Sequence, residues 1–383
     1  MNNWMPYCHV PWTNIDISPK GDISPCCKFL NYRYEYLVSN ITRNTIEEYL
    51  ESPTLKDVKR DFLKDRWPKG CDRCRIEEEN NIESRRLSDE KRYKEYLDNH
   101  RNNGFISASI AFGNTCNLTC IICDAGSSSR WHDEYKKIYK VDIRPNHFYK
   151  DQFVDNFISF SPNLKHLDIP GGEPMLSGVP QQKQLLKYYI DNNKAHDISL
   201  HYFTNCTIFP DDEWLSLWQY FKQIEIQLSI DGVRERFEYL RYPGNWIEVE
   251  QNAIKYKQLA STMPNLKLSI STTVSAYNIG YLDEVIDWAL ENNYDAPWLG
   301  RLHNPIHLRC TVWRVDAKRH LLGKLRYGDH RRIYKPFVSY IERDDDSQHF
   351  ETFRYNLLRH DNYRKLSFAK TFPEMFEFLR DRK

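Results

Sequence analysis

The middle of the chain alternates short apolar runs with stretches of helical periodicity. Runs rich in β-branched and apolar residues lie at 105–111, 164–169, 197–204, 223–230, 266–274 and 297–303. Between them, residues 181–192, 247–259 and 280–292 place apolar side chains at helical spacing. Alternating strands and helices of this kind predict a parallel sheet with right-handed crossovers, so we expect an α/β fold.

The two ends of the chain follow other patterns. Near the start, two short alternating runs flank a Pro-Lys-Gly turn at residues 19–21, which predicts a β-hairpin. The charged run over 77–94 predicts a solvated connecting helix, and the charged, aromatic sequence beyond about residue 311 predicts several helices. We therefore expect three parts: a cysteine-rich β-hairpin and helix domain at 1–95, an α/β domain at 100–310 and a C-terminal helical extension at 311–383.

Composition and charge bear on the possible partners of the protein. The 54 basic and 53 acidic residues give a net charge of +1, so charge does not support nucleic acid as a partner. No stretch approaches the roughly 20 apolar residues that cross a bilayer. The start, MNNWMPYCHVPW, has neither a charged region nor an apolar core typical of a secretion signal. We expect a cytoplasmic protein without a membrane partner.

Three of the ten cysteines lie in one loop directly after the run at 105–111. In GNTCNLTCIICDAGSSSRW these are Cys116, Cys120 and Cys123. Three thiolates can ligate three irons of a [4Fe–4S] cluster and leave the fourth iron open to a small molecule. Zinc is the alternative, with Asp124 or His132 as a fourth ligand. The carboxyl end of a strand is where parallel α/β proteins build their sites.

The CxxxCxxC loop resembles the signature of radical S-adenosylmethionine (SAM) enzymes, and DIPGGEPML after the next strand resembles their GGEP motif. The resemblance implies a partial (β/α)6 TIM-like barrel, a SAM-binding [4Fe–4S] cluster held by the three cysteines, and SAM itself. It also implies that Gly171, Gly172 and Glu173 meet the methionyl amino group of SAM. Without that context, a Gly-Gly pair after a strand is an ordinary turn.

The resemblance extends to the ends of the later strands. It implies that SAM also contacts residues in FTNC, LSIDG and TTVSAYN and in the cysteine loop, namely Thr204, Asn205, Ser229, Asp231, Val274, Asn278 and Ile122. Ile122 occupies a position where the family commonly has an aromatic residue, so its contact with adenine is expected to be apolar. Asn205 and Asp231 are equally compatible with plain turn chemistry.

A second cysteine group precedes the α/β region. The opening C-x(12)-G-x(4)-C, formed by Cys8, Gly21 and Cys26, and a closing CxxC, formed by Cys71 and Cys74, resemble the SPASM and twitch auxiliary-cluster domains. The resemblance implies a second [4Fe–4S] cluster. The same four thiols suit a structural zinc site, and Cys27 is an alternative ligand to Cys26. In most such enzymes the auxiliary domain follows the barrel, whereas here it precedes it.

The implied activity is reductive cleavage of SAM to a 5′-deoxyadenosyl radical, which takes hydrogen from a substrate. A flavodoxin or ferredoxin would supply the electron, and a ribosomally made peptide or a small molecule is the expected substrate. One alternative is a nucleobase or hypermodified DNA base, stacked on aromatic residues of the tail: Tyr327, Tyr334, Phe337, Tyr340 and Tyr355. These aromatics are also typical of core packing. An alternative of another class is a non-catalytic zinc scaffold. No catalytic side chain is predicted.

Overall fold

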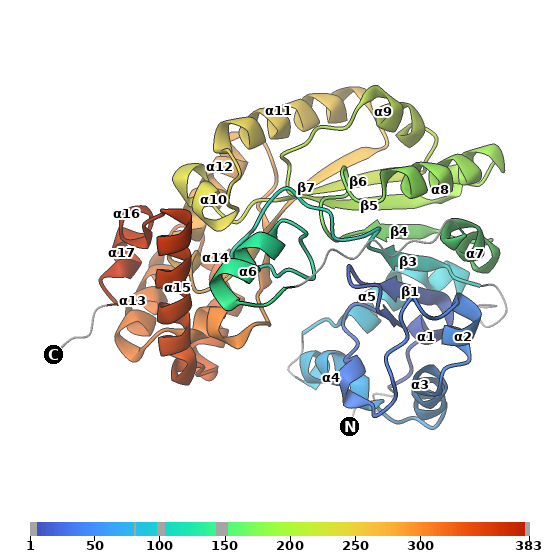
Figure 1. Ribbon diagram of the computed structural model, residues 1–383, viewed down its shortest axis with the longest axis horizontal. Helices are drawn as coiled ribbons and strands as arrows, with labels where there is room; N and C mark the ends of the chain where they lie inside the picture. Colours follow the sequence, from blue (N-terminus) through green and yellow to red (C-terminus); the bar gives the residue numbers. More distant parts are fainter. Residues whose placement is uncertain (1–5, 80–81, 98–103, 143–151, 380–383) are drawn as a thin grey trace. The chain divides into compact units, whose positions relative to one another are not determined.

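The computed structural model describes residues 6–79, 82–97, 104–142 and 152–379, and these form a mixed α/β protein (Figure 1). Its strands follow the order β2-β1-β3-β4-β5-β6-β7-β8. They are β1 (Asn14–Ile17), β2 (Ile23–Ser24), β3 (Ser107–Ile110), β4 (His166–Ile169), β5 (Ser199–Thr204), β6 (Gln223–Ser229), β7 (Leu266–Val274) and β8 (Trp298–Arg301). All six predicted strand runs are strands, and the α/β fold class is confirmed.

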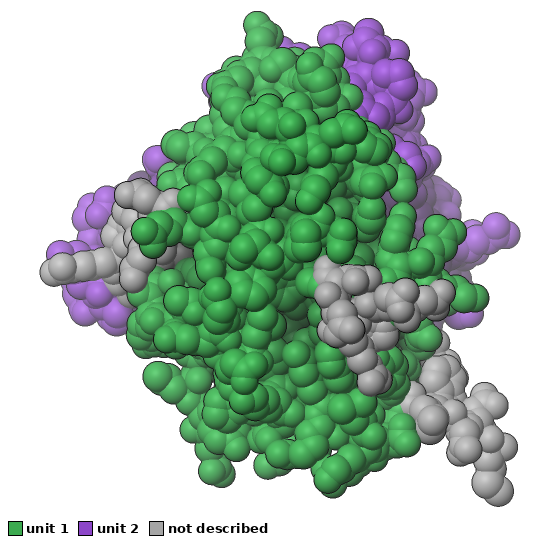
Figure 2. Space-filling view, turned by 90° about the vertical axis from the view of Figure 1, so that its right-hand side faces the viewer, with its two compact units in different colours: residues 1–116, 144–203, 210–225 green, residues 117–143, 204–209, 226–383 purple. Residues whose placement is uncertain are grey.

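The chain divides into two compact units (Figure 2). Unit 1 comprises residues 1–116, 144–203 and 210–225, and unit 2 comprises residues 117–143, 204–209 and 226–383. Each unit consists of three segments that are separated in the sequence, so residues of the two units alternate along the chain. The three consecutive domains predicted above stay a prediction.

The predicted N-terminal hairpin is present in unit 1. β1 pairs with β2 in antiparallel register, with Asp16 opposite Ser24. The other edge of β1 pairs in parallel with β3, with Asp16 opposite Ser109, and β3 pairs in parallel with β4. The hairpin of the cysteine-rich region therefore extends the parallel strands that follow it in the sequence.

Helices of unit 1 flank these strands. They are α1 (Val10–Thr13), α2 (Ile46–Leu50), α3 (Pro53–Leu63), α4 (Asp72–Glu79), α5 (Arg85–Tyr93), α7 (Phe153–Phe160), α8 (Val179–Asp191) and α9 (Asp212–Trp218). Alternate residues of β5 are buried, as expected for a strand with one face on a helical layer. Its buried Leu200 and Tyr202 lie beside strand residues of the same kind, such as Leu167 and Ile169 of β4.

The charged run at 77–94 is not the single solvated helix that we predicted. Its described residues form the end of α4 and the whole of α5, which Ser84 caps by accepting a hydrogen bond from Leu87 N–H at 3.3 Å. Residues 80–81 lie outside the described residues. Arg86 is buried and pairs with Glu78 at 2.6 Å. A charged side chain can be buried when it pairs with an opposite charge, even in a stretch whose many charges predict exposure to solvent.

Unit 2 contains β7, β8 and most of the later helices. These are α6 (Trp131–Tyr139), α10 (Arg234–Leu240), α11 (Trp246–Thr262), α12 (Leu282–Glu291), α13 (Val315–Tyr327), α14 (Arg331–Arg343), α15 (Phe350–Arg364), α16 (Phe368–Thr371) and α17 (Pro373–Phe376). Two of the tail aromatics, Tyr334 and Phe337, belong to the hydrophobic core, whereas Tyr327 and Tyr355 are exposed. In the part of the chain that is described, no helix combines the length and the apolar character that a bilayer span requires.

Candidate iron–sulfur centres and cofactor site

Three of the four N-terminal cysteines, Cys8, Cys26 and Cys71, belong to one apolar cluster of unit 1, and the Cys74 thiol is an electrostatic neighbour of all three. Cys8 precedes α1, Cys26 follows β2, and Cys71 and Cys74 lie in a 3₁₀ turn and at the start of α4. Cys8 and Cys74 are buried, and the other two are half-buried. Their apolar surroundings include Val10, Phe29, Val58 and Phe62. The fold therefore brings cysteines from both ends of the matched sequence pattern into one local group of thiols.

The electrostatics of this group show that its members are neighbours. Burial raises the pKa of Cys8 to about 12, and the Cys74 thiol adds to the rise. Burial also raises the pKa of Cys71, as do the nearby Cys8 and Cys74 thiols. For Cys26, burial is again the main cause of a raised pKa, and Cys71 and Cys74 contribute. Such thiols become thiolates only against a strong local positive charge, which a metal centre supplies.

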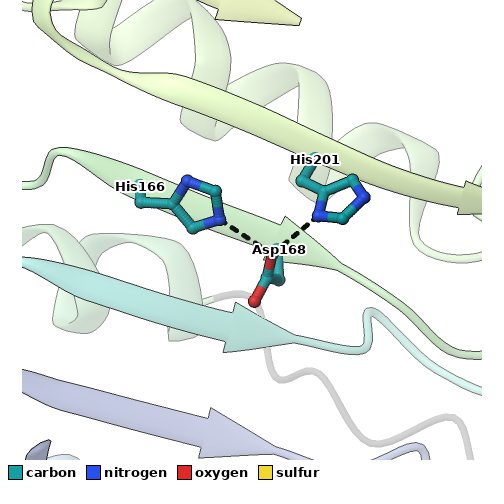
Figure 3. Close-up of side chains that lie close together, drawn as sticks. All are labelled: His166, Asp168 and His201. Carbon is teal, nitrogen blue, oxygen red and sulfur yellow. Dashed lines mark hydrogen bonds and ion pairs between the residues drawn. The ribbon is translucent and has the colours of Figure 1, made fainter. Parts of the chain in front are cut away.

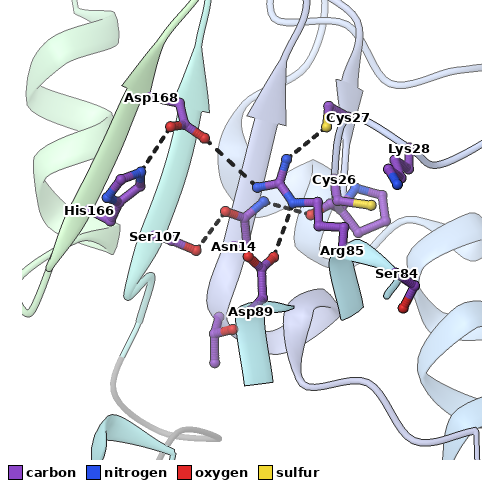
Figure 4. Close-up of polar contacts among 12 residues, drawn as sticks. Asn14, Cys26, Cys27, Lys28, Ser84, Arg85, Asp89, Ser107, His166 and Asp168 are labelled. Carbon is purple, nitrogen blue, oxygen red and sulfur yellow. Dashed lines mark hydrogen bonds and ion pairs between the residues drawn. The ribbon is translucent and has the colours of Figure 1, made fainter. Parts of the chain in front are cut away.

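Cys26 and Cys27 have different surroundings (Figure 4). The Cys27 sulfur accepts a hydrogen bond from Arg85 Nη1 at 2.7 Å, and the same guanidinium pairs with Asp89 at 3.0 Å. Cys27 is exposed, and Arg85, Asp16 and Asp168 are the charged groups that shift the pKa of its thiol. Burial is the main cause of the raised pKa of Cys26, and the neighbouring groups that shift it are, in order, Cys27, Arg85, Cys71 and Cys74. Of the two, Cys26 packs in the apolar cluster that contains Cys8 and Cys71, and its role as the ligand stays a prediction.

This difference predicts opposite results for two neighbouring substitutions. Cys26→Ser removes a cluster ligand and should lower the iron content of reconstituted protein from about eight to about four per chain. Cys27→Ser should leave the iron content unchanged. Iron and acid-labile sulfide analysis measures both. An equal loss in the two variants, or a loss only in Cys27→Ser, contradicts the assignment.

The three-cysteine loop is described in two parts. Cys116 ends the first segment of unit 1, and Cys120 and Cys123 belong to unit 2, where the Cys123 N–H donates to the Cys120 carbonyl at 3.0 Å. Arg241 Nη1 lies 3.9 Å from the Cys120 sulfur. The other guanidinium nitrogen pairs with Asp231 at 2.8 Å. Arg241 therefore contacts both Asp231, a predicted SAM-binding residue, and Cys120, a predicted cluster ligand.

The GGEP segment lies against the start of the cysteine loop within unit 1. Gly171 and Gly172 follow β4 and have positive φ angles of 83° and 56°. A Cβ on Gly172 would collide with the Thr115 carbonyl oxygen. The same oxygen accepts a hydrogen bond from the Glu173 N–H at 2.8 Å, and Glu173 is fully buried. The glycine pair therefore allows this turn to approach the residue that precedes Cys116.

Gly172→Ala is expected to disturb this contact. A left-handed backbone costs a non-glycine residue about 1–3 kcal/mol, and the collision with Thr115 adds to that. We expect a lower free energy of unfolding and a weaker hold on cluster iron, measured by denaturant titration and iron analysis. Gly323→Ala is the matched control, because Gly323 lies in α13 with no atom of the described residues within 4 Å of its Cβ position. The control should be neutral or slightly stabilising. Equal effects of the two changes contradict the packing role.

Apart from Ile122 in the cysteine loop, the remaining predicted SAM contacts lie in unit 2 at the ends of β5, β6 and β7 or directly after them. Asn205 follows β5, accepts a hydrogen bond from Thr207 N–H at 2.9 Å and donates to Asn117 Oδ1 at 3.0 Å. Asn117 directly follows Cys116. Asp231 Oδ1 accepts from Thr273 N–H at 2.7 Å, and Asn278 donates to the Asp231 carbonyl at 2.9 Å. The side chains of Asn205 and Asp231 therefore fix loops, as the turn interpretation predicts, and their contacts with SAM stay a prediction.

Thr204, Val274 and Asn278 are buried, and Ser229 is half-buried at the end of β6. The Thr204 hydroxyl accepts a hydrogen bond from the Cys206 N–H at 3.0 Å. Contacts of these four residues with SAM stay a prediction.

A cavity of about 850 Å³ opens in unit 2 beside the cysteine loop. Ile122 and Cys123 line it from the loop, and α6 and α15 supply other walls. The remaining lining residues are Ile121, Asp124, Ser127, Trp131, Tyr135, Tyr139, Tyr277, Asn304, Pro305, Ile306, His307, Leu308, Asn356 and His360. Aliphatic and aromatic side chains make up most of the lining, and no lysine or arginine occurs among the described residues that form it.

Sequence reasoning missed a buried ionic group that supports this cavity. Glu134 of α6 pairs with His360 at 2.8 Å and with Arg364 at 3.0 Å, both on α15. Arg364 also donates to the Thr119 carbonyl in the cysteine loop at 2.6 Å. The interaction joins residues 230 positions apart. Local sequence does not predict such a pair, because helical periodicity shows which face of a helix is buried but not which distant residue that face contacts.

Comparisons with known proteins bear on the N-terminal region. Residues 8–75 match the profile of SPASM, an iron–sulfur cluster-binding domain. The match contains Cys8, Cys26, Cys71 and Cys74, and it confirms the predicted resemblance of this region to SPASM domains. No curated protein matches the chain.

Three solved structures are among those similar to this chain. Native anSMEcpe with bound AdoMet is 19% identical, with 61% of each chain covered and a TM-score of 0.44. Streptococcus suis SuiB bound to S-adenosylmethionine is 14% identical, with 83% of this chain and 68% of that chain covered and a TM-score of 0.35. TYW1 with a lysine-pyruvate adduct is 13% identical, with 58% and 74% covered and a TM-score of 0.32. The chain spans about 61% of the length of anSMEcpe.

Proposed function

We propose that the protein is a radical SAM enzyme with two [4Fe–4S] clusters. The proposed ligands of the first cluster are Cys116, Cys120 and Cys123, and those of the auxiliary cluster are Cys8, Cys26, Cys71 and Cys74. The observation that carries the proposal is the contact of the GGEP turn with Thr115, because it brings the second motif to the start of the first. An ordinary turn at the GGEP segment and a zinc site at the cysteine loop would have no reason to lie beside each other.

The residues around the loop have roles that follow from their chemistry. Three thiolates leave one iron of a cubane open, and bound SAM there supplies a 5′-deoxyadenosyl radical after one-electron reduction. The Gly171–Gly172 turn offers backbone carbonyls, and the Glu173 carboxylate a negative charge, to the amino group of SAM. Thr204, Asn205, Ser229, Asp231, Val274, Asn278 and Ile122 are the proposed further contacts of SAM. A flavodoxin or ferredoxin is the proposed electron donor.

Arg241 adds a positive charge that the sequence did not reveal as part of the site. It lies between Asp231 and the Cys120 sulfur, and it is largely buried. A guanidinium at this distance stabilises the thiolate form of a cysteine, so Arg241 favours Cys120 as a ligand.

The cavity of unit 2 supports a peptide or small-molecule substrate. Its described lining contains aromatic rings and amides but no lysine or arginine, and phosphate groups of a nucleic acid are normally met by such cations. Tyr135, Tyr139 and Tyr277 are among its lining residues, and aromatic rings suit contact with a planar or aromatic substrate group. A nucleobase is the second candidate, since the same rings suit base stacking, but the neutral charge of the chain favours the first.

Spectroscopy of the reconstituted protein tests the proposal. Protein with about eight irons per chain and matching sulfide is reduced without oxygen, and its electron paramagnetic resonance (EPR) spectrum is recorded with and without SAM. We expect SAM to change the spectrum of one cluster, because it binds the open iron. A spectrum that SAM leaves unchanged, or a colourless protein that binds zinc and no sulfide, overturns the proposal.

A further inference from the structure

One face of the unit 1 sheet is polar at successive levels. The cross-strand register aligns Asn14, Ser107, His166 and Ser199 in one row and Asp16, Ser109, Asp168 and His201 in the next. Neighbouring residues on these strands point to the opposite face, which carries Ile15, Ala108, Leu167 and Leu200. Buried polar groups are costly unless they are paired or bind a ligand. The two polar rows are therefore a candidate binding site.

Three of these side chains converge on one point (Figure 3). Asp168 Oδ1 lies 2.8 Å from His166 Nε2 and 3.2 Å from His201 Nδ1. All three ligand atoms lie within 4.8 Å of one another. The side chains are between 10% and 15% exposed, so the group is sheltered but reachable. None of these residues belongs to either cysteine group.

We propose that His166, Asp168 and His201 form a third metal site, which binds one divalent transition-metal ion. Two imidazoles and one carboxylate are the ligand set of the 2-His-1-carboxylate sites, which hold Fe(II) on one face of the metal and leave other positions open. Metal–ligand bonds of about 2.1 Å at right angles place neighbouring ligand atoms about 3.0 Å apart. The distances of 2.8 and 3.2 Å lie on either side of that value.

The surroundings of Asp168 prepare it as a ligand. Both imidazoles approach the same carboxylate oxygen, Oδ1. Arg85 Nη2 approaches the other carboxylate oxygen, Oδ2, at 3.9 Å (Figure 4). One oxygen of Asp168 therefore faces the two imidazoles, and the other faces a cation.

The outer nitrogen of His201 is a second, independent observation. His201 Nε2 is buried and has no hydrogen-bond partner among the residues that the structure describes. The nearest charged group is the Glu225 carboxylate, with Oε1 3.8 Å away. A histidine that binds metal through one nitrogen commonly presents the other N–H to a carboxylate, which fixes its orientation. In the metal-free cluster His201 Nδ1 lies within hydrogen-bond distance of Asp168 Oδ1, while Nε2 makes no hydrogen bond within the described part of the chain.

The imidazole and carboxylate donors define the class of metal. Such a set suits Fe(II), Mn(II), Co(II) and Zn(II) and is unsuited to an iron–sulfur cluster, which requires thiolates. The open positions of a bound ion would accept oxygen or nitrogen atoms of a substrate. The polar neighbours Ser109 and Asp16 lie on the same face of the sheet, so such a substrate meets hydrogen-bonding groups there.

Binding of Mn²⁺ to reconstituted full-length protein tests the proposal, because the free aqua ion is counted by its EPR signal. We expect one Mn²⁺ per chain, with nitrogen couplings from two imidazoles in the electron spin-echo spectrum. His201→Ala and Asp168→Asn should weaken binding by more than the roughly 10–100-fold that loss of an outer partner costs. His196→Ala is the control, since His196 is an exposed histidine 3.9 Å from the Asp197 carboxylate.

The arms of this experiment separate the metal site from the proposed function. Cys120→Ala should leave Mn²⁺ binding unchanged even where SAM chemistry is lost, since it does not contribute a ligand. Absence of saturable binding in the unaltered protein overturns the proposal, as does unchanged binding in both His201→Ala and Asp168→Asn. If the variants fail to fold, bound Mn²⁺ without imidazole nitrogen couplings in the unaltered protein overturns it as well.

Discussion

Cys120→Ala is expected to abolish the production of 5′-deoxyadenosine from SAM. Two thiolates cannot hold the cubane that three hold with one iron open, and the loss of Cys120 also removes the sulfur beside Arg241. Iron content should fall from about eight to about four per chain, since the N-terminal cysteines keep the auxiliary cluster. Chromatography of the reaction products and iron analysis measure the two effects on the same sample.

Cys310→Ala is the matched control for this change. Cys310 is fully buried and belongs to neither cysteine motif, as is typical of a cysteine that packs as a small apolar core residue. It should retain both clusters and the product. Formation of 5′-deoxyadenosine by Cys120→Ala at the rate of the unaltered protein would contradict the assignment of the loop.

Glu134→Gln is expected to have the largest effect on stability. The substitution leaves Arg364, which is 1% exposed, without its carboxylate partner. Removing one member of a buried ion pair costs about 3–5 kcal/mol, because the other charge stays buried and uncompensated. Because Arg364 also holds the Thr119 carbonyl, the cysteine loop should loosen with it. Urea unfolding followed by fluorescence, with cluster loss followed by absorbance, measures both consequences.

An exposed ion pair provides the comparison for Glu134. Glu83 pairs with Lys91 at 3.0 Å, and their side chains are 52% and 72% exposed. Glu83→Gln should change stability by less than about 1 kcal/mol, since such pairs gain little in water. Similar unfolding midpoints for Glu134→Gln and the unaltered protein would show that Arg364 finds another partner, and the supporting role of the pair would be wrong.

The sequence was most informative where local chemistry decides structure. Runs rich in β-branched and apolar residues located all six strands of the α/β region. In β5, SLHYFT, every second residue is buried, because a strand with one buried face has a period of two. The cysteine motifs were readable because cluster ligands require thiolates at short spacings. Gly172 was identified through its motif, and the structure supplies the reason in its approach to Thr115.

Other features depend on pairings between distant segments, which no local pattern encodes. The parallel pairing of β1 with β3 joins residues 14 and 107, and Glu134 meets Arg364 across 230 positions. The charged sequence around Arg85 predicted solvent exposure, yet Arg85 turns inward to Cys27 and Asp168. His166 and His201 each sit singly in a strand, so their convergence on Asp168 depends on the register of β4 and β5.

Product formation by iron-replete protein is the most direct test of the proposed cleavage of SAM by one-electron reduction. Reconstituted protein is mixed with SAM and dithionite without oxygen, and 5′-deoxyadenosine and methionine are quantified over time. We expect equal amounts of both products, whose formation depends on the reductant and is lost in Cys120→Ala. Iron-replete protein that forms neither product contradicts the proposed radical SAM activity.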